Sequence, residues 1–222
     1  MLGPIAIMPS APVLVPELAG AATEAAELRT AVLAAAAALP PRWVAFGDGA
    51  DAIYQPDSAG TFAGFGADVA VRLSPGAVRP ADLPLCALIA GWVRGQTQPH
   101  AEAVVHAHTD PGAAFAAGRR VRDEIDQADE PIGVLIVADG ANTLTAAAPG
   151  GHHPADVEQQ RMLDDALAGG DATALTGLGA QIVGRAGFAA LAGLAGGPAR
   201  SVTQLYRDAP YGVGYFVGVW RP

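Results

Sequence analysis

Short apolar runs alternate with longer segments of helical pattern in the first quarter of the chain. The run at residues 3–8 predicts a buried strand, and a proline-rich extended loop then leads to an alanine-rich helix over residues 17–39. Two prolines end this helix because neither can donate an intrahelical hydrogen bond. A second apolar run at residues 43–46 predicts another buried strand, so the chain begins with a strand, a helix and a strand.

The middle of the chain continues this order after a glycine-rich, polar stretch. We expect strands at residues 68–73, 103–108 and 132–138, and helices at residues 84–95 and 111–129. Asp110 is placed to cap the second of these helices, which begins at a proline.

The last third of the chain predicts further helices and two final strands. The apolar side of one helix is marked by Val157, Met162, Leu163 and Leu167. Further helical segments are expected at residues 172–179 and 181–195, and strands at residues 202–206 and 213–220. Because strands alternate with helices, the sequence predicts an α/β protein with a layered αβα fold in a single domain, residues 1–222. Ligands of such folds bind at the loops that follow the carboxyl ends of the strands.

Composition agrees with a globular domain and excludes several classes of function. Hydrophobic residues make up 51% of the chain and charged residues 16%, which is enough to fill a sizeable core. All 13 basic residues are arginine, and the net charge of -9 repels nucleic acid. The absence of lysine from the sequence excludes a Schiff-base mechanism. The high content of alanine, glycine, proline and arginine is typical of an actinobacterial protein.

The chain shows no targeting pattern. The first 16 residues have no basic segment before their apolar residues, so no signal peptide is predicted. Charged residues interrupt the alanine-rich run at residues 19–39, which predicts no membrane span. We therefore expect a cytoplasmic protein without a membrane partner. Cys86 is the only cysteine, so no internal disulfide can form, and its apolar neighbours predict a small buried side chain.

Several polar side chains follow predicted strands and are candidate pocket residues. Asp48 and Asp139 each come directly after a buried strand, where a carboxylate either faces a pocket or satisfies backbone N–H groups in a turn. His152 and His153 either line the mouth of the pocket or only begin a helix. Tyr211 either contacts a ligand or belongs to a packed aromatic C-terminus.

A pair of histidines is spaced as on a strand. His106 and His108 are two residues apart, so both imidazoles should lie on one face, an arrangement that a metal pair also uses. The alternative is two polar residues at the end of a strand, without a metal.

Five segments, taken in order, resemble a known family. They are MPSAPVLVPEL at residues 8–18, GVLIVADGAN at 133–142, APGG at 148–151, LDDAL at 163–167 and APYGVGY at 209–215. Their order and spacing resemble the class III extradiol ring-cleavage dioxygenases, in particular the B-subunit-like proteins. The resemblance implies a layered αβα fold with a central mixed sheet. The family reads Pro-His-Pro-Pro where this chain has Ser10, and Ser-Gly-Asp-Leu-Ser-His where it has Asp139 and Asn142.

The resemblance also implies a chemistry that these residues cannot perform. In the family, the first histidine helps to bind a ferrous ion together with a second histidine and a carboxylate, and a further histidine acts as acid and base. Ser10 cannot replace imidazole because its neutral hydroxyl is a poor ligand, and the amide of Asn142 does not titrate. We therefore expect a diverged homologue without ring-cleaving activity or cofactor, whose former active cleft binds a small molecule or a partner.

Two alternatives remain. The first is a metalloenzyme, an extradiol-dioxygenase-like oxidoreductase that holds Fe(II) through relocated ligands. These ligands would come from His106, His108, His152 and His153, with Asp48 or Asp139. The second is a structural subunit that forms a homo-oligomer or pairs with another chain.

Overall fold

Seven strands form the central sheet of the computed structural model, which describes residues 1–20 and 24–222. The strands are β1 (Leu2–Met8), β2 (Arg42–Asp48), β3 (Ala52–Tyr54), β7 (Glu102–His108), β8 (Ile132–Val137), β9 (Ser201–Asp208) and β10 (Tyr215–Arg221). Their order is β3-β7-β2-β8-β1-β10-β9. The four central strands β7, β2, β8 and β1 run parallel, whereas β3, β10 and β9 are each antiparallel to a neighbour. The sheet is therefore mixed.

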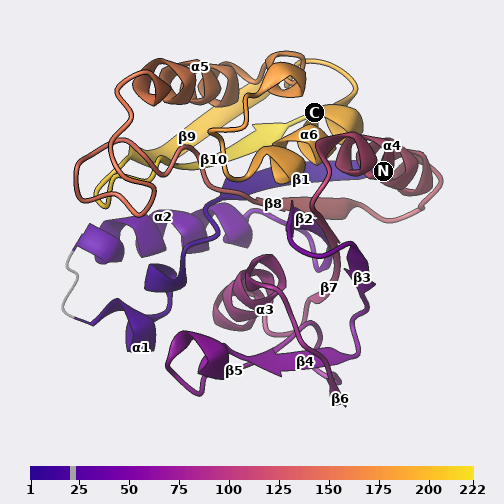
Figure 1. Ribbon diagram of the computed structural model, residues 1–222. Coiled ribbons are helices and arrows are strands. Elements are labelled where there is room, and N and C mark those ends of the chain that lie inside the picture. The colour runs from indigo at the N-terminus through magenta and orange to yellow at the C-terminus, as the bar shows by residue number, and fades with distance from the viewer. Residues whose placement is uncertain (21–23) are drawn as a thin grey trace.

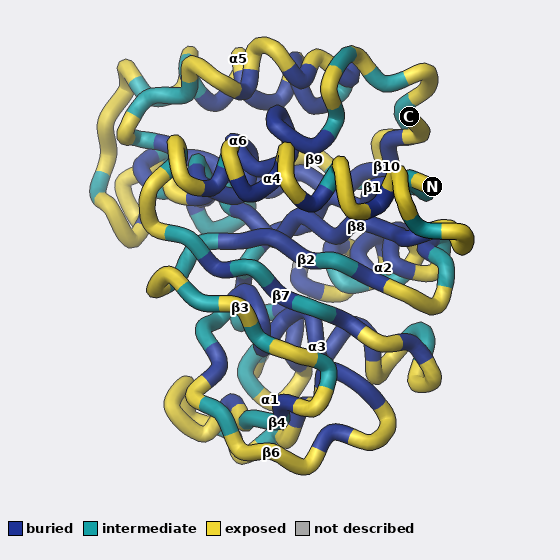
Figure 2. The backbone as a smooth tube through the Cα atoms, turned by 90° about the vertical axis from the view of Figure 1, so that its right-hand side faces the viewer, coloured by how far each residue is buried: buried dark blue, intermediate teal, exposed yellow. Residues whose placement is uncertain are grey.

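Helices cover both faces of this sheet (Figure 1). One face carries α2 (Glu24–Ala37) and α3 (Leu85–Thr97), and the other carries α4 (Pro111–Asp126), α5 (Asp156–Gly169) and α6 (Arg185–Ala195). Each face has its own hydrophobic core, and Figure 2 shows buried backbone along the central strands with exposed turns outside. The layered αβα fold with a central mixed sheet, expected from the sequence, is confirmed.

The central strands form where the sequence is apolar without interruption. Every residue of β8 is buried, as a parallel strand covered by helices on both faces requires. Asp110 caps α4 as expected, because its side chain accepts a hydrogen bond of 2.7 Å from the backbone N–H of Ala113. In the part of the chain that the structure describes, no helix has the length and apolar character needed to cross a membrane.

Helices α4 and α6 touch through their backbones. A side chain added at Gly118 of α4 would overlap the carbonyl oxygen of Ala190, and one added at Gly193 of α6 would overlap that of Phe115. Glycine at these two positions therefore permits a close backbone approach that larger residues exclude.

A second, smaller sheet lies beyond α3 (Figure 1). It consists of β4 (Ser58–Thr61), β5 (Ala70–Arg72) and β6 (Arg79–Pro80), in the order β5-β4-β6. The strand expected at residues 68–73 is thus shorter and belongs to this sheet. Its partners, and the edge strand β3, were missed because strands of two to four residues carry too little alternation to be recognised.

Three helical predictions need correction. The helix expected at residues 17–39 is divided into α1 (Pro16–Ala19), which ends at Gly20 with φ +57°, and α2; residues 21–23 lie outside the described residues. The segment expected at residues 172–179 is only a 3-10 turn, Ala174–Gly177, and two further 3-10 turns span Pro12–Leu14 and Phe62–Phe65. Helix α6 begins at Arg185 rather than at residue 181.

Of the four residues assigned to the apolar side of α5, two are buried and two are exposed. Leu163 and Leu167 are buried, but Val157 and Met162 are 50% and 54% exposed. Two polar residues, Gln160 and Asp164, are buried in their place.

Candidate functional site

Three polar residues meet where the parallel strands β1, β8 and β2 end. Met8 and Gly47 are both register partners of Val137, so the residues that follow these strands lie at one edge of the sheet. There the backbone N–H of Ser10 donates a hydrogen bond of 2.8 Å to Oδ1 of Asp139. We call Ser10, Asp48 and Asp139 the strand-end site.

Asp139 occupies the middle of the strand-end site. Burial raises the pKa of its carboxyl to about 7, although the Ser10 N–H lowers it, and the charge of Asp48 raises it further. The two carboxyls are therefore close enough to influence each other. The charge of Asp48 therefore adds to the effect of burial on the pKa of Asp139.

Asp48 is the last residue of β2. The sequence had suggested instead that it lies in the loop after this strand. The strand continues because Asp48 is paired in register with His108 of β7. Its carboxylate accepts hydrogen bonds from the backbone N–H groups of Ala186 and Gly187, in the first turn of α6. Burial nevertheless raises its pKa to about 6, since desolvation outweighs these bonds and the nearby charge of Arg185.

A buried polar network fixes the loop that carries Asp139. Gln160 of α5 accepts a hydrogen bond of 2.8 Å from the N–H of Ala141 and donates one of 2.8 Å to Asp164. Asp164 in turn forms an ion pair with Arg207 at 3.1 Å. No pattern in the sequence indicates this role for Gln160, because a glutamine on a helix is normally exposed.

One of the tyrosines near the C-terminus, Tyr215, lies near the strand-end site. Tyr211 packs edge to face against Tyr215, with ring centroids 6.5 Å apart. Tyr215 is buried, and burial together with the charge of Asp139 raises its pKa. Tyr215 therefore belongs to the surroundings of Asp139, which the sequence alone did not reveal.

The other pocket candidates lie on the loop after β8. Asn142 is partly buried, and its backbone oxygen accepts a hydrogen bond of 2.9 Å from Gly150. His152 and His153 are exposed, and the N–H of His153 bonds to the oxygen of Thr143 at 2.9 Å. The two histidines are thus near the start of α5 and open to solvent.

His106 and His108 lie on one face of β7, as expected. Their rings are 6.5 Å apart and roughly parallel, and the ring of His106 also stacks on Phe46 at 5.0 Å. Burial lowers the pKa of His106 to about 4, so it is neutral at physiological pH. Nδ1 of His108 lies 3.5 Å from Oδ1 of Asp51.

The described residues contain no complete ligand set for the metal-binding alternative. Across residues 1–20 and 24–222, no group of three or more His, Cys, Asp or Glu side chains is arranged to hold a metal ion. The strand-end site offers a hydroxyl and two carboxyls, whereas the mononuclear iron implied by the family resemblance needs imidazole as well. The residues present do not fit that ion.

Cys86 is buried in α3, as expected. Burial and the charge of Asp48 raise the pKa of its thiol to about 12, so it stays protonated and unreactive at neutral pH.

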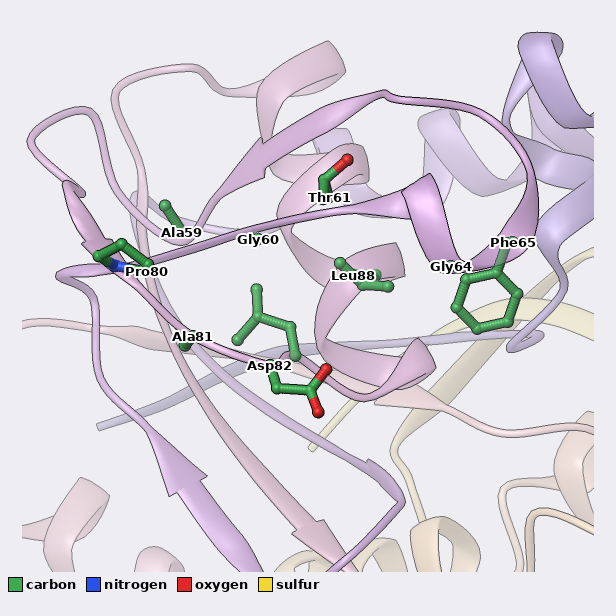
Figure 3. Close-up of a pocket in the computed structure, with 10 residues that line it drawn as sticks. Ala59, Gly60, Thr61, Gly64, Phe65, Pro80, Ala81, Asp82 and Leu88 are labelled. Atoms are coloured by element: carbon green, nitrogen blue, oxygen red, sulfur yellow. The ribbon is translucent and has the colours of Figure 1, made fainter.

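A separate cavity of about 470 Å³ lies between the small sheet and the start of α3 (Figure 3). Its walls come from β4, the segment after β6, and Leu88 of α3. In Figure 3, Phe65 and Pro80 lie at opposite ends of the labelled residues, with Asp82 between them. Asp82 is the one charged side chain in this lining, and it is exposed to solvent. The sequence did not predict this cavity.

Comparison with known proteins extends only to the fold. No protein-family model and no curated protein sequence matches the chain. The crystal structure of an uncharacterized protein from Escherichia coli K12 is similar, with a TM-score of 0.57 and 12% sequence identity. The match covers 99% of this chain and 100% of the other. The two chains therefore share a fold, and the similarity carries no statement about function.

Proposed function

We propose that this protein is a diverged relative of the class III extradiol dioxygenases that binds a small polar molecule at the strand-end site and does not cleave aromatic rings. The observation that carries the proposal is the pair of carboxyls of Asp48 and Asp139 at the carboxyl ends of adjacent parallel strands. Each has a raised pKa, and the charge of one raises the pKa of the other. Strongly perturbed titratable groups of this kind concentrate at functional sites.

The position of the pair supports ligand binding. Ligands of open α/β sheets bind outside the carboxyl ends of the strands, where Asp48 and Asp139 lie. Both residues keep some exposure as a whole, although Oδ2 of Asp48 is itself buried. Near neutral pH the pair presents negative charge with one carboxyl partly protonated, which suits a ligand rich in hydrogen-bonding groups.

The donor set argues against ring cleavage. Ser10 and Asn142 replace the two histidines of the matched motifs, and Oδ1 of Asp139 already accepts the N–H of Ser10. A catecholate and dioxygen would have to bind side by side on an iron ion for which Ser10, Asp48 and Asp139 provide no imidazole.

Iron loading and a ring-cleavage assay test the negative half of the proposal. The protein is incubated anaerobically with Fe(II), desalted, analysed for metal and then exposed to air with protocatechuate. We expect iron well below one ion per chain and no oxygen uptake that depends on the catechol. Stoichiometric iron with catechol-dependent oxygen uptake would contradict the proposal.

Ligand mapping tests the positive half. Small polar molecules are screened by ¹H–¹⁵N NMR of the full chain, using the amides of Ser10, Ala186 and Gly187 as reporters because they donate to the two carboxylates. We expect shifts at these amides that saturate with ligand. Shifts confined to Thr61 and Asp82 would move the binding site to the cavity at the small sheet, and no shifts with any molecule would overturn ligand binding.

A further inference from the structure

Asp48 and His108 lie side by side on the face of the sheet that α6 covers. They are register partners at the ends of β2 and β7, and neighbouring strands are about 4.8 Å apart. Phe46 and His106 are the register partners two residues earlier on the same strands, and their rings stack at 5.0 Å. Their side chains therefore point to the same face of the sheet. Side chains two residues further along point to the same face.

Each of the two side chains has a buried polar atom without a hydrogen bond. Within the described residues, neither Oδ2 of Asp48 nor Nε2 of His108 has a partner. Leaving such a group unbonded costs about 1–3 kcal/mol, so native proteins rarely do it without a function. Two of these atoms on paired residues indicate a shared function.

Other contacts hold both groups in place. The backbone N–H groups of Ala186 and Gly187 bond to the Asp48 carboxylate, and Asp51 lies 3.5 Å from Nδ1 of His108. The His108 side chain is 13% exposed, and its Nε2 is buried. Arg185 is near enough to lower the pKa of Asp48, but within the described chain it forms no ion pair with that carboxylate.

Both unbonded atoms are hydrogen-bond acceptors when the imidazole of His108 is in its neutral form with the proton on Nδ1. A carboxylate beside Nδ1 favours the imidazole tautomer that carries its proton on Nδ1, and this leaves a lone pair on Nε2. Asp48, with a pKa of about 6, is mostly ionised at pH 7.5, so its Oδ2 accepts as well. Two acceptors cannot bond to each other. They require a group with at least two donors between them.

We infer that Oδ2 of Asp48 and Nε2 of His108 together bind the ammonium group of a small primary amine. This assignment rests on the proposed function and names the class of its ligand. An ammonium group has three donors and no acceptor, and its charge matches the acidic pair of Asp48 and Asp139. A hydroxyl offers one donor, and a quaternary ammonium offers none.

Calorimetric titration of the full chain with ethylammonium at pH 7.5 tests the inference. We expect saturable binding of one ion per chain, and no binding of tetramethylammonium, which has the same charge without N–H donors. Asp48→Asn and His108→Phe should each weaken binding at least about tenfold, since each removes one acceptor while nearly keeping the shape. Asp82→Asn, at the cavity of the small sheet, is the matched control and should leave the affinity unchanged.

Three results would overturn the inference. These are equal binding of tetramethylammonium, unchanged affinity in both Asp48→Asn and His108→Phe, and a proton on Nε2 of His108 in ¹⁵N NMR of the wild-type chain. The NMR measurement needs no variant and decides the case even where a variant fails to fold. If a neutral molecule shifts the amide signals of Ser10 and Gly187 and ethylammonium does not bind, the inference is overturned and the proposed function stands. Ring cleavage by the iron-loaded chain would overturn the proposed function.

Discussion

The strand-end site and the cavity at the small sheet each have one property expected of a binding site: the first has perturbed polar groups, and the second has open volume. The strand-end site has buried carboxyls with raised pKa values, held by rigid parallel strands and by the first turn of α6. The cavity has space, about 470 Å³, but its one charged side chain, Asp82, is exposed. The difference shows that perturbed polar groups and open volume need not occur at the same place. Buried parallel strands desolvate the carboxyls of the strand-end site, whereas the small sheet and α3 leave open space between them.

The largest expected effect is a difference in unfolding free energy between a variant of the buried carboxyl of Asp139 and one of the exposed carboxyl of Asp82. The pKa of Asp139 is raised from the usual 3.8 to about 7, so its contribution to stability is fully present below about pH 4 and is lost as the pH rises through 7. Asn cannot ionise, and its oxygen still accepts the Ser10 N–H. At about 1.4 kcal/mol per pKa unit, Asp139→Asn should exceed the wild type in unfolding free energy by on the order of 4 kcal/mol at pH 8.5 and match it near pH 4.

Urea unfolding at both pH values measures this difference. Asp82→Asn serves as the control for the cavity, and its unfolding free energy should follow the wild type at both pH values. An Asp139→Asn curve parallel to that of the wild type would mean that Asp139 is solvated like Asp82, and the contrast between the two regions would disappear.

A smaller effect should follow from breaking the network behind the strand-end site. Gln160→Leu leaves the buried N–H of Ala141 without its acceptor and removes a donor from Asp164, which should cost about 2–3 kcal/mol of unfolding free energy. Thr61→Val at the cavity removes two exposed hydrogen bonds, one donated to Asp68 and one accepted from the N–H of Ala63, and should cost about 1 kcal/mol or less. Equal shifts of the two urea midpoints would show that the strand-end loop is not fixed by Gln160.

The smallest effect is expected in the small sheet itself. Arg79 and Asp57 form an ion pair at 2.9 Å, with both side chains at least half exposed. Water screens an exposed pair, so Arg79→Gln should change the melting temperature little, and less still in 1 M salt. A large, salt-insensitive loss would indicate that the small sheet is a more essential part of the fold than its exposure suggests.

The sequence predicts the central layers well because their signals are local. The continuous apolar run of β8 and the Asp110 cap of α4 depend on residues close together in the chain. The small sheet could not be predicted in the same way, since its strands are only two to four residues long and show little alternation.

The strand-end site was predicted only in part. That Asp48 and Asp139 follow strands could be inferred, but their influence on each other depends on strand order, which the sequence does not specify. The side of α5 that faces the core was assigned partly wrongly because Gln160 and Asp164 are buried polar residues, which a hydrophobic pattern places at the surface.

The close backbone contact of α4 and α6 through Gly118 and Gly193 has a consequence for the thermodynamics of binding. The close backbone contact leaves α6 little room to slide or rotate, so we expect the N–H groups that hold Asp48 to keep their position when a ligand binds. Little conformational entropy is then lost on association, because the acceptors are already in place. A ligand of this protein should accordingly bind in a single fast step, without the slow phase that accompanies rearrangement of a receptor.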